Sequence, residues 1–201
     1  VRIPHPEEVY LVWREKAPEG VQVPDFLPFG GDQEVPLTGF FGEGRAIHVT
    51  GSHHMATGIR TMEPTKDEIE ALVTRLSAKI ANHRLELAMT EERFLENAEV
   101  VIISYGAPSR PSLGAVASAR KEGHKVGFLR LKTIWPFPSH VIAALPKSVR
   151  HIVVVEMNLG QVIREVERVV CPDVVKTHLI PAIGGVVHTS NEIYNKIREL
   201  I

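Results

Sequence analysis

The sequence predicts an α/β protein built on a mostly parallel, doubly wound sheet. Three runs rich in Val and Ile, at 99–104, 125–131 and 151–156, are almost continuously apolar, as expected of strands that are buried on both faces. Helical patterns separate these runs, and parallel strands need such crossovers. We therefore expect an α/β domain over residues 97–201, preceded by an irregular wrapping linker and a long amphipathic helix.

Residues 1–63 are expected to form an extended linker segment. Pro and Gly recur throughout residues 1–45, and a stretch with so many chain breakers cannot build a core of its own. Short strands are predicted only at 8–13 and 46–50. We expect the rest to lie along neighbouring domains, anchored by large apolar side chains. These anchors are Phe26, Leu27, Phe29, Phe40 and Phe41.

Three histidines, His48, His53 and His54, lie in or beside a Gly-rich stretch of this linker. Three imidazoles could suggest a metal site. However, adjacent residues of an extended chain point to opposite sides, and no nearby carboxylate completes a ligand set. We therefore expect loop histidines that bond to the backbone, and no metal.

Residues 64–96 are expected to form a long connecting helix, with its clearest pattern over 65–89. Thr65 and Glu68 make a capping box at its start, in which each side chain bonds the backbone amide of the other residue. Apolar residues then follow the spacing of one helical face, and we expect this face to pack along the α/β domain or a partner. The residues of this face are Ile69, Leu72, Val73, Leu76 and Ile80.

Within residues 97–201 we expect four strands and four helices. After the first strand a helix is predicted over 111–122, with Gly123 just past its end, where Gly is common. The remaining elements that we can place are a helix from about 161 to 170, a strand at 174–180 and a final helix that opens with a capping box from Thr189 to Glu192.

The first candidate site follows the first strand. Tyr105, Gly106, Ser109 and Arg110 lie between that strand and its helix, where backbone amides of a helix N-terminus can bind an anion. Neither the dinucleotide fingerprint nor the P-loop pattern occurs there. The sequence leaves open an ordinary turn or a site for a nucleotide or coenzyme A.

The second candidate site follows the strand at 151–156. Glu156 ends an apolar strand, where folding does not need an acid, and Asn158 and Gln161 suit a tight turn into a helix. One interpretation is turn chemistry with a helix cap. The other is a polar cluster that orders a subunit interface or lies beside a cofactor. We name these three residues, with Trp135 and Phe137 of the apolar corner at 134–138, as candidate interface residues.

Composition narrows the classes of function. The chain is 44% apolar and 23% charged, with a net charge of −1, as is usual for soluble globular proteins. No apolar run approaches the ~20 residues that span a bilayer, no leader sequence is seen, and basic residues do not cluster with aromatic ones. We expect a cytoplasmic protein that binds neither membrane nor nucleic acid.

The single cysteine, Cys171, cannot form an internal disulfide or hold an iron–sulfur cluster on its own. It precedes Pro172 at the end of a predicted helix. We expect an unreactive, partly buried thiol.

Four blocks of sequence, at 104–110, 123–130, 133–138 and 155–161, occur in an order that identifies a family. With the stretches 41–44 and 48–51, they make the chain resemble the α subunit of 2-oxoacid:ferredoxin oxidoreductases from about residue 40 to the end. The branches that act on 2-oxoglutarate and on branched-chain 2-oxoacids are both compatible.

The resemblance implies an interdomain segment followed by a domain like the C-terminal domain of transketolases. The family's N-terminal domain, which carries the carboxylate that activates the cofactor, is not matched, so we expect catalytic residues there and in a partner subunit. The first residue is Val1 rather than Met, and we expect a piece of a longer polypeptide.

The implied reaction is the thiamine-diphosphate-dependent conversion of a 2-oxoacid and coenzyme A into an acyl-CoA and CO₂, with ferredoxin as the electron acceptor. Thiamine diphosphate, Mg²⁺ and iron–sulfur clusters are expected in the complete complex and not on this chain. The implied partners are a β subunit, further subunits, ferredoxin and coenzyme A.

We expect the isolated chain to be inactive and to have a structural and subunit-docking role. The main alternative is a stand-alone α/β module that binds coenzyme A or a nucleotide at the end of the strand before Gly106. Another transketolase-like enzyme without ferredoxin is a third alternative.

Overall fold

The computed structural model describes residues 2–31, 33–48, 55–59 and 63–201. It divides into two units, Val1–Asn82 and His83–Ile201, which are described separately below. None of the described helices is both long and apolar enough to cross a membrane.

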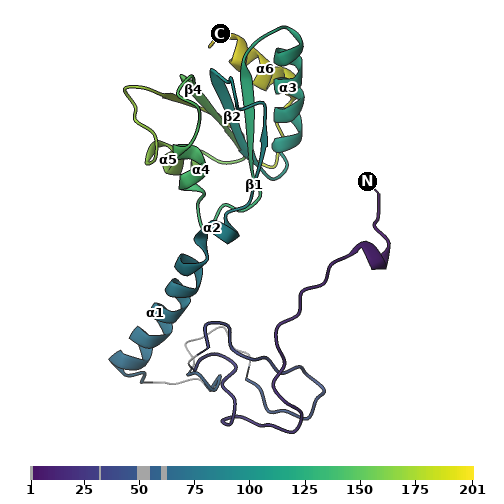
Figure 1. The fold of residues 1–201 in the computed structure, drawn as a ribbon, viewed down its shortest axis with the longest axis vertical. Coiled ribbons are helices and arrows are strands. Elements are labelled where there is room, and N and C mark those ends of the chain that lie inside the picture. The colour runs from purple at the N-terminus through teal and green to yellow at the C-terminus, as the bar shows by residue number, and fades with distance from the viewer. Residues whose placement is uncertain (1, 32, 49–54, 60–62) are drawn as a thin grey trace. The chain divides into compact units, whose positions relative to one another are not determined.

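The second unit is built on a five-stranded sheet with the order β1-β3-β2-β4-β5 (Figure 1). Its strands are β1 (Thr90–Arg93), β2 (Val100–Tyr105), β3 (Val126–Leu131), β4 (His151–Glu156) and β5 (Lys176–Pro181). All neighbouring strands from β3 to β5 pair in parallel, whereas β1 pairs antiparallel with β3. The predicted mostly parallel sheet is therefore confirmed, with an antiparallel edge strand that the sequence did not reveal.

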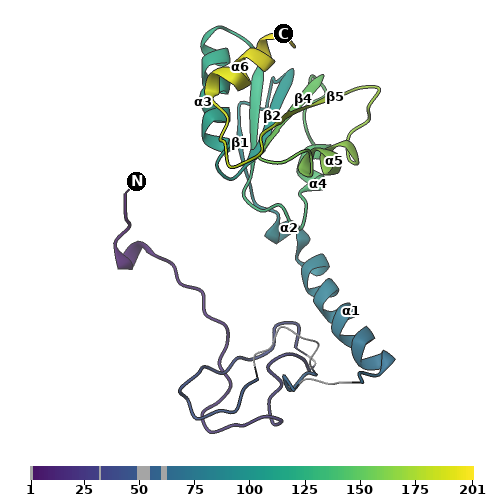
Figure 2. The same ribbon diagram turned by 180° about the vertical axis from the view of Figure 1, so that it is seen from behind.

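Helices cover both faces of this sheet (Figure 2). On one face, α3 (Ser109–Lys121) and α6 (Ser190–Arg198) pack against side chains of β2, β3 and β4. On the other face, α4 (Ser139–Ala143) and α5 (Val162–Glu167) do the same. Because the central strands alternate their side chains between two apolar layers, they are apolar at nearly every position. The doubly wound arrangement is confirmed.

The start of α6 follows the predicted signal. At α6, the Glu192 amide donates to Thr189 Oγ1 at 3.2 Å, and the Thr189 amide donates to Glu192 Oε2 at 2.7 Å, so this capping box is confirmed.

Helix α5 ends at Glu167, earlier than the predicted 170. Cys171 follows it and is exposed, so the prediction of a partly buried thiol is wrong.

The helical stretch predicted over 65–89 is divided in the structure. Helix α1 covers Lys66–Asn82, and the short α2 covers Arg84–Leu87. The capping box at its start is confirmed, because the Thr65 amide donates to Glu68 Oε2 at 2.7 Å and the Glu68 amide donates to Thr65 Oγ1 at 3.3 Å. No residue of α1 is buried within its unit. Packing of its apolar face along the α/β domain or a partner, and the boundaries at 63 and 96, stay predictions.

The first unit has little regular structure before α1. Its described part contains a 3₁₀ turn, η1 (Pro6–Glu8), and one isolated bridge between Lys16 and Thr38. No strand forms over 8–13, so that prediction is wrong. The predicted strand at 46–50 lies partly outside the described residues, and His53 and His54 lie entirely outside them.

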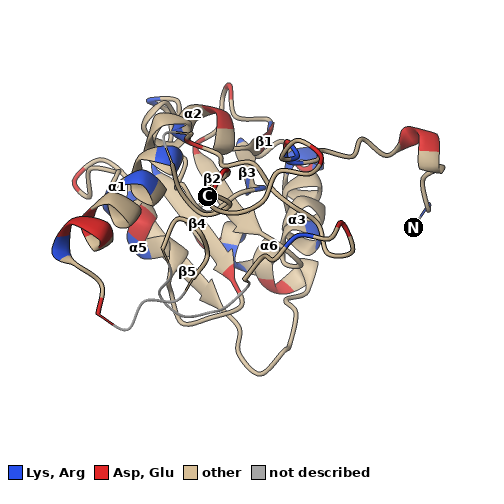
Figure 3. Cartoon of the chain, turned by 90° about the horizontal axis from the view of Figure 1, so that it is seen from below, with Lys and Arg blue, Asp and Glu red and all other residues tan. Residues whose placement is uncertain are grey.

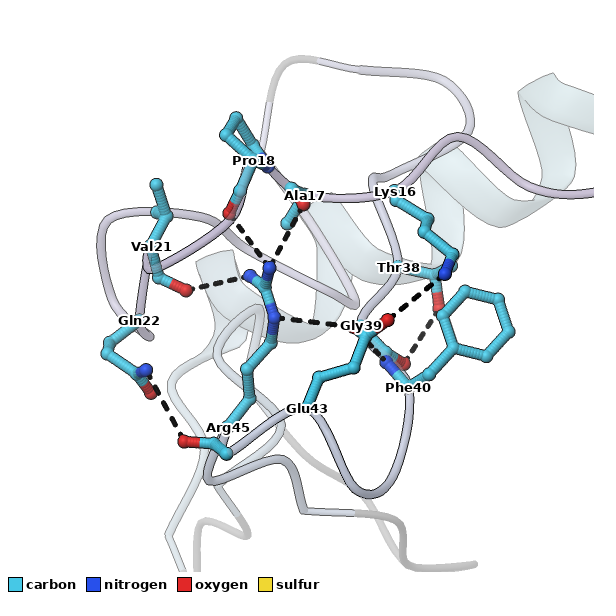
Figure 4. Close-up of polar contacts among 11 residues, drawn as sticks. Lys16, Ala17, Pro18, Val21, Gln22, Thr38, Gly39, Phe40, Glu43 and Arg45 are labelled. Carbon is cyan, nitrogen blue, oxygen red and sulfur yellow. Dashed lines mark hydrogen bonds and ion pairs between the residues drawn. The ribbon is translucent and has the colours of Figure 1, made fainter.

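A buried guanidinium holds this irregular unit together (Figure 4). The Arg45 side chain is only 5% exposed, and it donates to the carbonyl oxygens of Val21 at 2.8 Å, Pro18 at 2.8 Å and Ala17 at 3.1 Å. One side chain thus ties together two segments more than 20 residues apart in sequence. Of the predicted anchors, Phe26 is buried, Leu27, Phe29 and Phe40 are half-buried, and Phe41 is exposed.

Candidate functional site

Buried polar residues gather at one edge of the sheet. Among the described residues, those that are both polar and buried are Ser104, Ser109, Ser112, Glu156 and His188. Each lies at the carboxyl end of a parallel strand or in the segment that follows such a strand. In open α/β sheets this edge is where function is commonly placed. Charged residues otherwise lie mainly on the helices and loops, while β2 and β4 carry only Glu156 between them (Figure 3).

The Glu156 carboxylate is completely buried and fully engaged. Its Oε2 accepts hydrogen bonds from the Val162 amide at 2.9 Å and from the Tyr105 hydroxyl at 3.3 Å, and its Oε1 accepts one from the Ile163 amide at 3.1 Å. These amides belong to the first turn of α5, which otherwise lacks a side-chain cap. An acid at the end of an apolar strand therefore has a structural reason, because a carboxylate satisfies amides that the helix itself leaves unpaired.

Asn158 connects the same turn to the neighbouring strand. Its Nδ2 donates to the Tyr105 hydroxyl oxygen at 2.8 Å, while its Oδ1 accepts from the amides of Gly160 at 2.8 Å and Gln161 at 2.9 Å. Gly160 has φ +101°, a conformation that favours glycine. The two candidate sites of the sequence are thus one cluster, joined through Tyr105 across 51 positions of sequence.

The Tyr105 hydroxyl remains a hydrogen-bond donor over the physiological range. Burial raises its pKa above the ordinary value of 10.0, and the negative charge of Glu156 raises it further, while the hydrogen bond from Asn158 opposes the shift. The phenol therefore stays protonated at neutral pH, where it gives its proton to the carboxylate and accepts from the amide.

The other residues of the first candidate site do not join this cluster. Gly106 has φ +61° with open space where a Cβ would lie. Ser109 is buried, and its Oγ lies 3.4 Å from Ser104 Oγ, whereas Arg110 is exposed. Tyr105 is thus hydrogen-bonded to Glu156 of the neighbouring strand, whereas the turn after it exposes Gly106 and Arg110.

The candidate interface residues take different positions. Trp135 is 75% exposed, Phe137 is half-buried against the core on the α4–α5 face, and Gln161 is exposed. Sequence reasoning missed Leu159, which is 73% exposed between Asn158 and Gly160. An apolar residue in the middle of a polar turn was the signal that could have revealed it.

Sequence reasoning also missed His188 and Ser112. Both are buried, and no hydrogen-bond partner for either side chain is found among the described residues. His188 lies in the segment between β5 and α6, where apolar residues and two glycines gave no hint of a buried imidazole.

The polar groups at this edge hold turns of the backbone in position. Both oxygens of Glu156 are occupied by donors and shielded from solvent, so the carboxylate is not free to accept a proton from a substrate. The described part of the chain contains no group of three His, Cys, Asp or Glu residues that could hold a metal ion. What the cluster provides is a hydrogen-bonded turn that carries the exposed Leu159.

Comparison with known proteins places this fold in context. The family model described as pyruvate:ferredoxin oxidoreductase core domain II matches residues 98–193. The 2-oxoglutarate synthase subunit KorA of Methanothermobacter marburgensis is 38% identical over 98% of this chain and 51% of that subunit. The corresponding subunit of Methanothermobacter thermautotrophicus is 37% identical over 99% of this chain and 52% of that subunit. The ketoisovalerate oxidoreductase subunit VorB of M. marburgensis is 36% identical over 67% of this chain and 38% of that subunit.

Among solved structures, a 2-oxoglutarate:ferredoxin oxidoreductase from Magnetococcus marinus, with 2-oxoglutarate, coenzyme A and succinyl-CoA bound, matches with a TM-score of 0.75. The match covers 98% of this chain and 34% of that one at 22% identity, and it supports the fold alone. The chain spans about half the length of the 2-oxoglutarate synthase subunits that it matches.

Proposed function

Since this chain belongs to the family of 2-oxoacid:ferredoxin oxidoreductase α subunits, we propose that it forms the C-terminal structural and docking part of such a subunit. The complete complex would convert a 2-oxoacid and coenzyme A into an acyl-CoA and CO₂, and the electrons released would reduce ferredoxin. A β subunit and further subunits would complete the enzyme.

We take 2-oxoglutarate as the substrate. Three of the 2-oxoglutarate synthase subunits match 93–99% of the chain, and that of Archaeoglobus fulgidus matches 64%. The ketoisovalerate oxidoreductase subunit matches 67%, so the choice follows the three longest matches. The proposed products are succinyl-CoA and CO₂, and the Magnetococcus enzyme was solved with this substrate, coenzyme A and this acyl-CoA bound.

The cofactors of this reaction are assigned to the rest of the complex. Iron–sulfur clusters need several thiolates, and the chain has one cysteine. The described residues offer no cluster of three metal-binding side chains for the Mg²⁺ that accompanies thiamine diphosphate. When bound elsewhere, thiamine diphosphate supplies the decarboxylation chemistry and the protein supplies position.

The observation that carries the docking role is the apolar rim of the carboxyl edge. Large apolar side chains are exposed in the segments after β3, β4 and β5. They are Ile134, Trp135, Leu159, Ile183, Val186 and Val187. Such patches are typical of protein–protein contact surfaces, and aromatic residues such as Trp135 are enriched in them. The Tyr105–Glu156–Asn158 cluster holds the turn that carries Leu159 in place beneath the rim.

The test is an activity assay on two preparations. A complex purified through a tag on the polypeptide that contains this chain should reduce ferredoxin in the presence of 2-oxoglutarate and coenzyme A, and the isolated 201-residue chain should not. Turnover by the isolated chain, or inactivity of the complex with every 2-oxoacid tried, would overturn the proposal.

The alternative of a stand-alone module that binds coenzyme A or a nucleotide at Gly106 rests on the open space beside that turn. It is tested by calorimetric titration of the isolated chain with coenzyme A and ATP. Saturable binding in the micromolar range, lost when Gly106 is replaced by Val, would favour this alternative over the docking role.

A further inference from the structure

A second feature of the α/β unit lies at the opposite, amino edge of the sheet. There, a cavity of about 530 Å³ opens between the end of α4, the segment after α5 and the starts of β4 and β5. Its volume is in the usual range of small-molecule sites, roughly 300–1,000 Å³. The proposed function does not use this cavity.

The helices on the face of the sheet that carries the cavity are short. Helix α4 has 5 residues and α5 has 6, whereas α3 and α6 on the other face have 13 and 9. The cavity has a floor of half-buried apolar side chains from Leu145, Val170 and Val175, which pack on the buried core of this face.

Polar side chains are confined to the rim of the cavity. Of the residues that line it, Lys147, Arg150 and Cys171 are polar, and all three are exposed. No carboxylate is found among the described residues of the lining. An apolar floor with two cations at the rim matches a molecule with an aliphatic tail and an anionic head, because tail burial is hydrophobic and the head is attracted to the cations.

Two hydrogen bonds hold cations near the rim of the cavity. Arg150 Nη1 donates to the Lys147 carbonyl oxygen at 2.6 Å, so the guanidinium is held on the loop that carries Lys147. Lys176 Nζ donates to the Pro172 carbonyl oxygen at 3.1 Å, which places a third cation beside the segment of Cys171, and the exposed Asp173 carries one opposing charge in that segment. The carboxylate of Glu99, whose pKa is lowered first by its hydrogen bond to Lys125 and less by the charge of Arg150, is already bonded to Lys125 at 2.8 Å.

We infer that this cavity binds an anionic amphiphile with an aliphatic tail, with the tail over the floor of Leu145, Val170 and Val175 and the anionic head at Lys147 and Arg150. Two sources share this chemistry, a free aliphatic carboxylate and the acyl thioester of a phosphorylated carrier. The inference does not rest on the proposed function, since the two surfaces lie at opposite edges of the sheet.

The test uses Cys171, the single thiol of the chain, as a reporter. The rate of labelling by a neutral maleimide is measured on the full chain with decanoate, with decanoyl-CoA and with decyltrimethylammonium, each below its aggregation threshold. Decanoate or decanoyl-CoA should slow labelling at least fivefold in a saturable manner, and the cationic compound should not. The anion that saturates at lower concentration identifies the source.

Matched variants assign the effect to the cavity. Lys147→Glu should weaken the protection at least tenfold, whereas Lys121→Glu, the same change at an exposed lysine of α3 on the other face, should leave it unchanged. Ala143→Phe, at an exposed position of the rim, should block the tail. The inference is overturned if neither anion protects Cys171, if the cationic compound protects equally well, or if Lys147→Glu has no effect while far-ultraviolet circular dichroism shows an intact fold.

Discussion

Glu156 shows how a single residue can organise an edge of a sheet. It is buried at the end of an apolar strand, yet three donors meet its two oxygens. Two of those donors are amides at the start of α5, where the helix dipole favours negative charge. The carboxylate therefore stabilises the turn between β4 and α5 and links it to Tyr105.

Replacement of Glu156 by Gln tests this role. Gln has the same shape as Glu, but its NH₂ group would face N–H or O–H donors that need an acceptor. We therefore expect a loss of about 2 kcal/mol in the free energy of unfolding. Urea denaturation followed by circular dichroism measures it. Glu199→Gln, at an exposed position near the C-terminus, should change stability by less than about 0.5 kcal/mol. Equal effects of the two substitutions would rule out the capping role.

The raised pKa of Tyr105 predicts a dependence of stability on alkaline pH. Burial and the charge of Glu156 favour the protonated phenol in the folded protein. Because the folded pKa lies above the unfolded value of 10.0, the phenol's contribution is complete below pH 10 and is lost as pH rises through the folded pKa. The stability of the wild-type chain should therefore fall more steeply above pH 10 than that of Tyr105→Phe.

The measurement is the urea midpoint from about pH 8 to 11 for the wild type, Tyr105→Phe and Tyr10→Phe. Tyr10 is exposed, so its variant should follow the wild-type slope. Tyr194, whose pKa is also raised by its hydrogen bond to Glu122, is present in all three proteins and cancels in the comparison. Identical slopes for the wild type and Tyr105→Phe would contradict the burial of this phenol.

At the scale of elements, the parallel core was the most predictable part. The strands β2, β3 and β4 could be located because long runs of Val and Ile are typical of strands buried on both faces, and α6 because its capping box is a local motif. Strand β1 could not be located, since Thr90–Arg93 is polar at every position and becomes a strand only by pairing with β3. Its position depends on tertiary contacts that no local pattern records.

The candidate site was predictable in its members but not in its arrangement. Tyr105, Glu156 and Asn158 were each identified from turns after strands. That they form one hydrogen-bonded cluster depends on β2 and β4 being neighbours in the sheet. His188 and Leu159 were missed because burial and exposure in a loop depend on what packs against it. Exposure of Cys171 was missed for the same reason.

The capping box of α6 gives a prediction at this scale. Thr189→Ala removes the acceptor of the Glu192 amide and should cost about 1 kcal/mol, because α6 buries Ile193 and Ile197 on the sheet. Hydrogen exchange should show the amides of α6 opening faster. Thr65→Ala removes the same acceptor at α1, which buries no residue in its unit, and should leave exchange in α6 unchanged. Faster exchange of α6 in both variants would contradict the prediction.

At the scale of the whole molecule, the two units are stabilised by different means. The second unit has one apolar layer on each side of a sheet. In the first unit, the buried Arg45 side chain donates hydrogen bonds to three carbonyl oxygens of a chain rich in Pro and Gly. The core of the second unit lies in these two layers, and the exposed apolar residues of the rim are not part of it. The rim at the carboxyl edge can therefore contact a partner without loss of the fold.

The most direct test of the docking role is the amount of partner subunit retained by the complex. Complexes are purified through a tag on this polypeptide, carrying either Trp135→Ser or Val174→Ser, and the β subunit per tagged chain is measured by quantitative mass spectrometry. Both side chains are apolar and exposed, but they lie at opposite edges of the sheet. We predict that Trp135→Ser lowers the retained β subunit at least tenfold and that CoA-dependent 2-oxoglutarate turnover falls in step. The Val174→Ser complex should retain the β subunit. Full retention in the Trp135→Ser complex would contradict the assignment of the carboxyl edge as the docking surface.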